Sequence, residues 1–429
     1  MMTNKIKSVR YSLGLALMFI GMQFATAVRN INSSINLVDL MMVISFILLI
    51  DYQNLSKGKI DLKSFKNKIL LMIIGLMLIF ACGALISQNN TYLFYHLYVI
   101  CICIAFMTHA NIKNSFNYLP YIICILGGII SIVVFYQATL HFTNFSFGGY
   151  ELTGKLYLEE GGDPITIPRS LVITGIAFLF LNFKSKTVFS KIISIVLRIS
   201  FLLIIYLDLL AFANRSSLLF LTLIIFFYFI SKGIKCKNKA KSLLISLLIL
   251  VSLCILILNV PFIRDKIVYT FENTINALGT MFGKNGYDDS SGATRFSTIN
   301  FAIETLNNSN IWNIFFGNGY MFEYIDVPAL QIFVDLGFFI GLIYIFLTII
   351  LPLFIIFKSL SNKKNVIQCF IMLISIQYIF DQFYCGTPYN YFNFIYIISL
   401  VSFFPFTKYK TITRNKFSSN KLYAPGECL

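Results

Sequence analysis

The sequence predicts an all-α, polytopic integral membrane protein with about twelve transmembrane helices. The mean hydropathy is +0.79, and only 12% of the 429 residues are charged, whereas a soluble chain of this length needs far more polar surface. Apolar runs of near-bilayer length recur along the whole chain, and the positive charges fall into the short segments between them. These observations indicate a single membrane domain covering residues 1–429.

Twelve apolar runs are predicted to cross the membrane. The first run follows Lys5, Lys7 and Arg10 and has no clear small-residue cleavage site, so we interpret it as a retained signal anchor. The run at 327–357 is longer than a bilayer is thick and is expected to begin as an interfacial segment. In chain order the runs are 11–28, 35–50, 69–86, 92–108, 118–140, 167–183, 192–213, 216–230, 242–260, 327–357, 366–383 and 389–406.

Charge asymmetry predicts the orientation of these runs. With the N-terminus in the cytoplasm, 25 of the 34 lysines and arginines fall in predicted cytoplasmic segments, including a basic cytoplasmic tail at 407–429. In contrast, 11 of the 18 acidic residues fall in two large extracytoplasmic loops, 141–166 and 261–326. Both termini are therefore predicted to be cytoplasmic.

Several other classes of protein are disfavoured by the composition. The formal charge of +16 does not indicate nucleic-acid binding, because the basic residues are divided among short loops. The nine cysteines lie mostly in apolar runs, contain no C-x-x-C pair and are odd in number, so we interpret them as small packing residues. The three histidines are scattered without a zinc-ligand spacing, so no metal site is expected.

Three arginines are predicted at the outer face, where the positive-inside bias disfavours them. Arg215 lies in a tight turn before an apolar run, and Ser216 and Ser217 can cap the helix that follows. An arginine beside a helix N-terminus favours anion binding. Simpler interpretations are a snorkelling turn residue for Arg215, an interfacial anchor for Arg169 and a solvated charge for Arg295. If the three converge, their planar forks suit a lipid-linked diphosphate, whose leaving group they would stabilise.

Residues 294–306 are predicted to form an amphipathic helix in the second outer loop. Phe296, Ile299, Ile303 and Leu306 recur at helical spacing, so this helix can lie on the membrane with these side chains facing down. A cluster of aromatic residues typical of a membrane interface follows, at Trp312, Phe315, Phe316, Tyr320 and Phe322.

Four acidic residues fall within predicted spans, where a charge is costly: Asp39, Asp208, Asp335 and Asp381. Arg198 is a candidate partner, but it lies ten residues before Asp208, too far for a pair on one helix. The pattern is compatible both with pairing between helices and with a proton path.

Six short sequence motifs follow one another between about residues 140 and 341. They are "ELTGKLYLEEGGDPITIPRS" at 151–170, "NRSS" at 214–217, "TRFSTINFAIETL" at 294–306, "FGNGY" at 316–320, Asp326 and "ALQIFVDLGFFIG" at 329–341. In their order and in the twelve-span layout, the chain resembles the oligosaccharide repeat-unit polymerases (the Wzy class) and the related O-antigen ligases. This resemblance implies a GT-C-like membrane fold with catalysis at the outer loops.

The resemblance implies glycosyl transfer that builds O-antigen or capsular polysaccharide on the outer face of a bacterial cytoplasmic (inner) membrane. The donor would be a growing glycan on undecaprenyl diphosphate, and the acceptor a single lipid-linked repeat unit. A hydroxyl of the acceptor attacks the anomeric carbon of the donor, and polyprenyl diphosphate leaves. No cofactor and no nucleic acid is implied. Apart from the lipid bilayer, the candidate partners are a chain-length regulator and a flippase of the same pathway.

The same resemblance implies roles for particular residues. Arg215 and Arg295 would hold the diphosphate and offset its growing charge, with Arg169 assisting. Asp326 or Glu323 would take the proton of the acceptor hydroxyl. Further contacts to the diphosphate or glycan would come from Ser216, Gly154 and Tyr320.

Two departures from the family pattern and two other classes of protein bear on this interpretation. The ligases carry a histidine in the second loop, and 261–326 contains none, which favours a polymerase. Glu151 stands where many members have an arginine. A flippase or other transporter of the same glycan is the main alternative, but the repeated halves expected of a flippase are not evident. Motifs of the shape-and-division peptidoglycan polymerases are not found.

Overall fold

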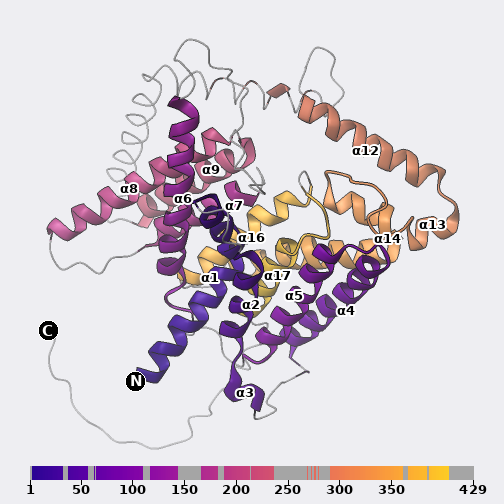
Figure 1. Cartoon of the computed structure of the whole chain (residues 1–429), viewed down its shortest axis with the longest axis horizontal. Helices are drawn as coiled ribbons and strands as arrows, with labels where there is room; N and C mark the ends of the chain where they lie inside the picture. The colour runs from indigo at the N-terminus through magenta and orange to yellow at the C-terminus, as the bar shows by residue number, and fades with distance from the viewer. Residues whose placement is uncertain are drawn as a thin grey trace, which may run out of the picture.

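The computed structural model describes residues 2–31, 37–56, 62, 64–109, 116–143, 166–181, 188–212, 214–235, 290–360, 366–383 and 386–404, with five isolated positions between 268 and 279. Every regular element within these residues is helical, which confirms the all-α class for this part of the chain (Figure 1). The helices are α1 (Met2–Ile31), α2 (Val38–Leu49), α3 (Tyr52–Ser56), α4 (Phe65–Ile86), α5 (Asn90–Met107), α6 (Leu119–Thr143), α7 (Thr166–Phe180), α8 (Val188–Ala211), α9 (Arg215–Lys235), α12 (Ser290–Asn308), α13 (Ile311–Phe316), α14 (Pro328–Ile345), a π-helical turn (Phe346–Ile350), α15 (Leu351–Leu360), α16 (Val366–Asp381) and α17 (Phe392–Phe403).

Hydropathy places the membrane-spanning helices well. Eleven of the twelve predicted runs coincide with a described helix, and the run at 242–260 lies outside the described residues. Five segments are long and apolar enough to cross a membrane: Lys5–Arg29, Phe65–Ile86, Asn90–Met107, Leu119–Gln137 and Pro328–Ser359. Five shorter apolar helices accompany them, including α7 and α17, whose side chains are buried along most of their length. The described part of the chain is therefore a multi-pass membrane bundle. Residues 144–165 of the predicted loop 141–166 and the predicted tail at 407–429 lie outside the described residues.

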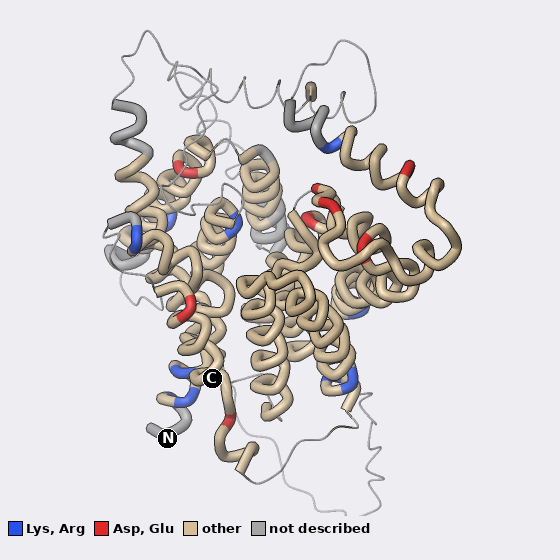
Figure 2. Tube along the Cα trace, turned by 45° about the vertical axis from the view of Figure 1, so that its right-hand side comes forward, with Lys and Arg blue, Asp and Glu red and all other residues tan. Residues whose placement is uncertain are grey.

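Segments predicted to face the same side of the membrane meet in the structure. At the end that holds the N-terminus, Arg10 Nη2 donates to the Ile50 carbonyl oxygen (2.8 Å). There also, Lys66 Nζ donates to the carbonyl oxygens of Phe106 (2.9 Å) and His109 (2.6 Å). Helix α12 lies at the opposite end, and Figure 2 shows several acidic positions gathered beneath it. These contacts bring together basic segments that the charge pattern predicts to face the same side.

A break in α14 joins two of the sequence motifs. Gly337 has a φ of +76°, so the long apolar segment is interrupted at a buried position inside the bundle. The carbonyl oxygens of Val334 and Asp335 accept instead from the backbone amides of Asn318 and Gly319, both at 2.9 Å. Non-helical backbone at membrane depth is tolerated when protein groups satisfy it in this way. The "FGNGY" turn therefore docks by its backbone onto "ALQIFVDLG".

Helix α12 packs on protein through one apolar stripe. Ile299, Ala302 and Leu306 lie against a small cluster formed by Ile325, Val327, Leu330 and Val334. Of the four residues predicted to face the membrane, Ile299 and Leu306 thus face protein, whereas Phe296 and Ile303 are 37% and 47% exposed. The prediction was wrong for the first two because the segment after α13 folds back beneath the helix. This docking determines where the side chains of α12 point.

His109 is expected to make the folded state sensitive to acid. Its ring is 3% exposed, packs on Tyr11 and Phe116, and bonds through Nε2 to the Leu49 carbonyl oxygen (2.6 Å). Burial lowers its pKa from 6.5 to about 4, so between these values the unfolded chain binds a proton that the folded protein does not. Stability should therefore be level above about pH 7 and fall towards pH 4 by up to about 3 kcal/mol.

Thermal unfolding of the detergent-solubilised protein at about pH 7 and about pH 5 measures this effect. His109→Gln should reduce the difference in Tm between the two pH values. If the difference is the same in wild type and variant, other groups cause the acid sensitivity.

Candidate functional site

An ion pair between Arg295 and Asp326 forms the centre of the candidate site. Arg295 lies in the second turn of α12, and its Nε is 2.9 Å from Oδ2 of Asp326. The Tyr324 hydroxyl (3.0 Å) and the Gly386 backbone amide (3.1 Å) both donate to Oδ1. The two ionic side chains are 24% and 18% exposed, so the pair is open to ligands. Because both oxygens of Asp326 are engaged, this carboxylate is suited to orienting Arg295.

Glu323 supplies a second carboxylate, three residues before Asp326. Its side chain is exposed, and its carboxylate has no partner among the described residues. Its backbone is nevertheless held, because Gln331 Nε2 on α14 donates to the Glu323 carbonyl oxygen at 3.0 Å. Of the two carboxylates predicted to accept a proton, Glu323 is therefore the one whose oxygens make no contact within the described part of the chain.

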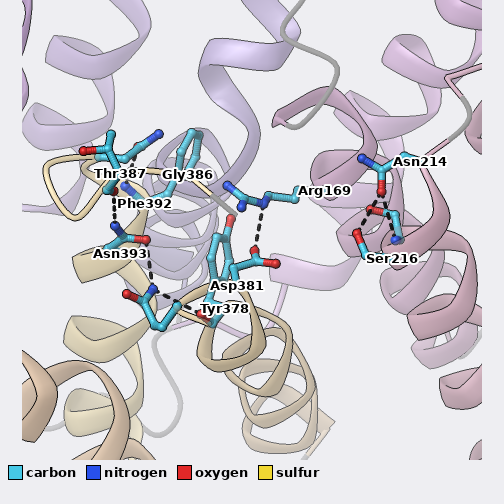
Figure 3. A network of polar contacts seen from close by, with 12 residues as sticks. Arg169, Asn214, Ser216, Tyr378, Asp381, Gly386, Thr387, Phe392 and Asn393 are labelled. Carbon is cyan, nitrogen blue, oxygen red and sulfur yellow. Dashed lines mark hydrogen bonds and ion pairs between the residues drawn. The ribbon is translucent and has the colours of Figure 1, made fainter. Parts of the chain in front are cut away.

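Arg169 is not an exposed anchor at the interface, because it pairs with Asp381 inside the bundle. Its Nε is 2.7 Å from Asp381 Oδ2, and the two side chains are only 9% and 4% exposed. The guanidinium also lies 5.9 Å from the centroid of the Tyr378 ring. Figure 3 shows Arg169 extending from α7 towards Asp381 and Tyr378 on α16. The pair therefore links α7 and α16 through side chains that are almost fully buried.

The turn before α9 is capped by a residue other than those predicted. Asn214 Oδ1 accepts from the backbone amide of Ser217 and from the hydroxyl of Ser216, both at 3.0 Å (Figure 3). Asn214 is therefore the N-cap, and Ser216 supports it. Arg215 is the first residue of α9, and the placement of its side chain lies outside the described part of the chain. Gly154 also lies outside it.

Of the three arginines predicted to converge, the structure describes the side chains of Arg169 and Arg295. Arg169 and Arg295 pair with carboxylates on different elements, Asp381 on α16 and Asp326 before α14. Each guanidinium has five N–H donors, of which Nε makes the ion pair. Exposure favours Arg295 for contact with a diphosphate.

Tyr320, a predicted substrate contact, belongs to a buried aromatic network. Its hydroxyl lies 2.9 Å from His96 Nε2 on α5, and its ring centroid is 4.3 Å from that of Tyr389. Burial raises the pKa of Tyr320, so its hydroxyl stays protonated. Gly83 on α4 makes room for the ring, since an added Cβ would lie 2.6 Å from it. Tyr320 thus anchors the "FGNGY" turn to the α4–α5 pair.

The four acidic residues of the predicted spans do not contact one another, and each has its own surroundings among the described residues. Asp335 accepts from the Tyr389 hydroxyl (2.8 Å) and Gln331 Nε2 (3.2 Å). Asp208 accepts from the Ser131 hydroxyl at 2.6 Å. Asp39 is exposed in the first turn of α2. The predicted partner Arg198 donates instead to the Leu181 carbonyl oxygen. Three of the four acids are therefore held by contacts between elements far apart in sequence, which favours the packing interpretation.

Sequence reasoning missed several residues of this region. Asn214 belongs to the "NRSS" motif, yet the two serines were the predicted caps. His96 has no metal-ligand spacing to single it out, and nothing near Tyr389 or Gly386 marks them in the sequence. The described residues hold no cluster of three or more His, Cys, Asp or Glu side chains suited to a metal ion. Comparison with protein-family models gives no match, and comparison with curated proteins gives none either.

Proposed function

We propose that the protein polymerises polyprenyl-diphosphate-linked oligosaccharide repeat units on the outer face of a bacterial cytoplasmic membrane. The observation that carries this proposal is the partly exposed Arg295–Asp326 pair, at the end of the bundle opposite the N-terminus, with the exposed Glu323 three residues before Asp326 in the chain. A partly exposed cation and an exposed carboxylate in the same region of the chain suit a reaction in which an anionic group leaves and a hydroxyl loses its proton. The backbone hydrogen bonds from "FGNGY" to α14 hold the segment that leads into Glu323 and Asp326.

The reaction requires one bond to form and one to break. The acceptor hydroxyl oxygen bonds to the anomeric carbon of the donor glycan. The bond from that carbon to the diphosphate oxygen breaks, and its electron pair leaves with polyprenyl diphosphate. Negative charge grows on the diphosphate, where Arg295 and Arg215 would stabilise it. The hydroxyl proton passes to the Glu323 carboxylate, while Asp326 orients Arg295.

Glu323→Gln is expected to lower polymerisation on the order of 100-fold or more, because the amide cannot accept the proton. The protein should remain folded, since the side chain is exposed and makes no described contact. A deletion strain complemented with wild type, Glu323→Gln, Arg295→Lys or Glu272→Gln tests this by gel analysis of surface polysaccharide. Glu272 is an exposed carboxylate of the same outer loop and serves as the matched control.

A polymerase predicts that the deletion strain attaches one repeat unit and makes no ladder. Glu323→Gln and Arg295→Lys should resemble the deletion, and Glu272→Gln should resemble wild type. If the deletion instead removes all surface glycan and traps the lipid-linked unit on the cytoplasmic leaflet, the protein is a transporter. If Glu323→Gln gives a normal ladder, Glu323 is not the proton acceptor.

A further inference from the structure

We propose that a cleft between α12 and α13 binds the glycan part of the substrate and selects neutral or amino sugars over acidic ones. The cleft has a volume of about 490 Å³ and is open to the outside. Its walls come from the last turns of α12, the turn into α13, and Asn318 of the "FGNGY" motif. This inference rests on the proposed function, because it names where the glycan of that reaction lies.

One face of α12 supplies half of the cleft. Phe301, Glu304, Thr305 and Asn308 recur at spacings of three and four residues, so they form a single stripe. The packing stripe that includes Ile299 lies on another face of the helix. The cleft-facing stripe therefore does not serve the docking of α12, and its side chains are available to a ligand.

The facing wall holds amide groups in fixed positions. Asn310 Oδ1 accepts from the Asn313 backbone amide (2.8 Å) and so caps α13. Asn313 Nδ2 donates to Asn318 Oδ1 (2.9 Å), and Asn318 Nδ2 donates to the Val334 carbonyl oxygen (3.0 Å). Each amide has two N–H donors and an oxygen with two lone pairs, so hydrogen-bonding capacity remains. Side chains held in this way lose little entropy when a ligand binds.

The lining has the chemistry of a sugar site. Amide and carboxylate groups present two neighbouring polar atoms, which match adjacent hydroxyls of a pyranose ring. The half-exposed ring of Phe301 offers an apolar face on which the C–H face of a sugar can stack. Among the described lining residues Glu304 is the one charged side chain, so acidic sugars and phosphates are disfavoured.

The cleft is also well placed to hold the glycan away from the reacting end. Thr305 lies ten residues beyond Arg295 on the same helix, about 15 Å along its axis. A glycan whose diphosphate end lies at Arg295 would reach the cleft only after several sugar units. The cleft would therefore retain the chain without taking part in bond formation.

Trp312 provides a direct measurement, because it is the one tryptophan of the sequence and precedes the lining residue Asn313. The probe is the one-repeat-unit oligosaccharide released from the cell's own surface polysaccharide, with sucrose as the control sugar. Titration of the purified full-length protein in nanodiscs should change Trp312 emission saturably. Asn308→Ala should raise the dissociation constant about tenfold, as expected for the loss of one hydrogen bond to the sugar.

Asn307→Ala is the matched control, since Asn307 is the exposed neighbour on the same helix and does not line the cleft. It should bind like wild type. In cells, Asn308→Ala should shorten the polysaccharide ladder without abolishing it, whereas Arg295→Lys leaves one repeat unit. No emission change, or equal affinities for Asn307→Ala and Asn308→Ala, would overturn the subsite even if the deletion strain shows a polymerase defect. If the oligosaccharide changes Trp312 emission but the deletion strain traps the lipid-linked glycan on the cytoplasmic leaflet, the glycan subsite stands and the polymerase proposal is rejected.

Discussion

Gly337→Ala should destabilise the protein by about 3–5 kcal/mol and detach the "FGNGY" turn from α14. A Cβ at position 337 would lie 2.3 Å from the Phe315 carbonyl oxygen and 2.5 Å from the Gly317 amide nitrogen. The φ of +76° adds strain for any residue with a side chain. The backbone hydrogen bonds from Asn318 and Gly319 to α14 would then be lost together. Thermal unfolding in detergent and the amount of folded protein in membranes measure the effect.

Two further glycine substitutions separate the two causes of this destabilisation, which are backbone strain and the close contact of the added Cβ. Gly319 has a φ of +124°, and a Cβ added there would meet no other group within 4 Å, so Gly319→Ala tests backbone strain alone and should cost about 1 kcal/mol. Gly75 lies inside α4 with open space around it, so Gly75→Ala should be neutral or slightly stabilising. If Gly337→Ala unfolds no more easily than Gly319→Ala, the close approach of the two backbones is not what holds the turn.

The helices were predictable from sequence because the bilayer imposes their length and apolar character. The runs at 69–86 and 118–140, for example, coincide with α4 and α6 without any knowledge of their neighbours. The alternation of basic segments likewise predicted which loops meet, as the contacts of Arg10 and Lys66 show. These properties depend on each segment and its flanking charges, so a single sequence is enough to recover them.

The contacts of the candidate site depend on choices between distant segments. The Tyr320 hydroxyl reaches His96, which is 224 residues away in the chain. Arg169 could pair with any buried acid, and the packing of α7 against α16 selects Asp381. The sequence patterns identify Arg295 and Asp326 as candidates, but their pairing follows from how α12 docks on the segment around Ile325. Such docking is decided by shape, which hydropathy does not encode.

Arg169→Met is expected to destabilise the protein by about 3–5 kcal/mol, because it leaves the buried Asp381 without its cation. Asp381→Leu should destabilise the protein by a similar amount, because it leaves the buried Arg169 without its carboxylate. The double variant Arg169→Met/Asp381→Leu should recover most of the loss, since apolar side chains of similar size can replace a buried ion pair. Thermal unfolding of the four proteins gives the coupling between the two positions, and the polysaccharide ladder gives their activity.

The ladder of the double variant decides what Arg169 does. If Arg169 braces α7 against α16, as the burial of the pair indicates, the double variant, with its stability recovered, should polymerise at close to the wild-type level. A double variant that is stable but makes only single repeat units would show instead that Arg169 touches the diphosphate, as the family resemblance suggests. Arg169→Lys refines the result, because an ammonium keeps the charge but loses the planar fork. If Arg169 only braces the two helices, Arg169→Lys should remain active. If Arg169 instead contacts the phosphate through two hydrogen bonds, both the double variant and Arg169→Lys should be inactive.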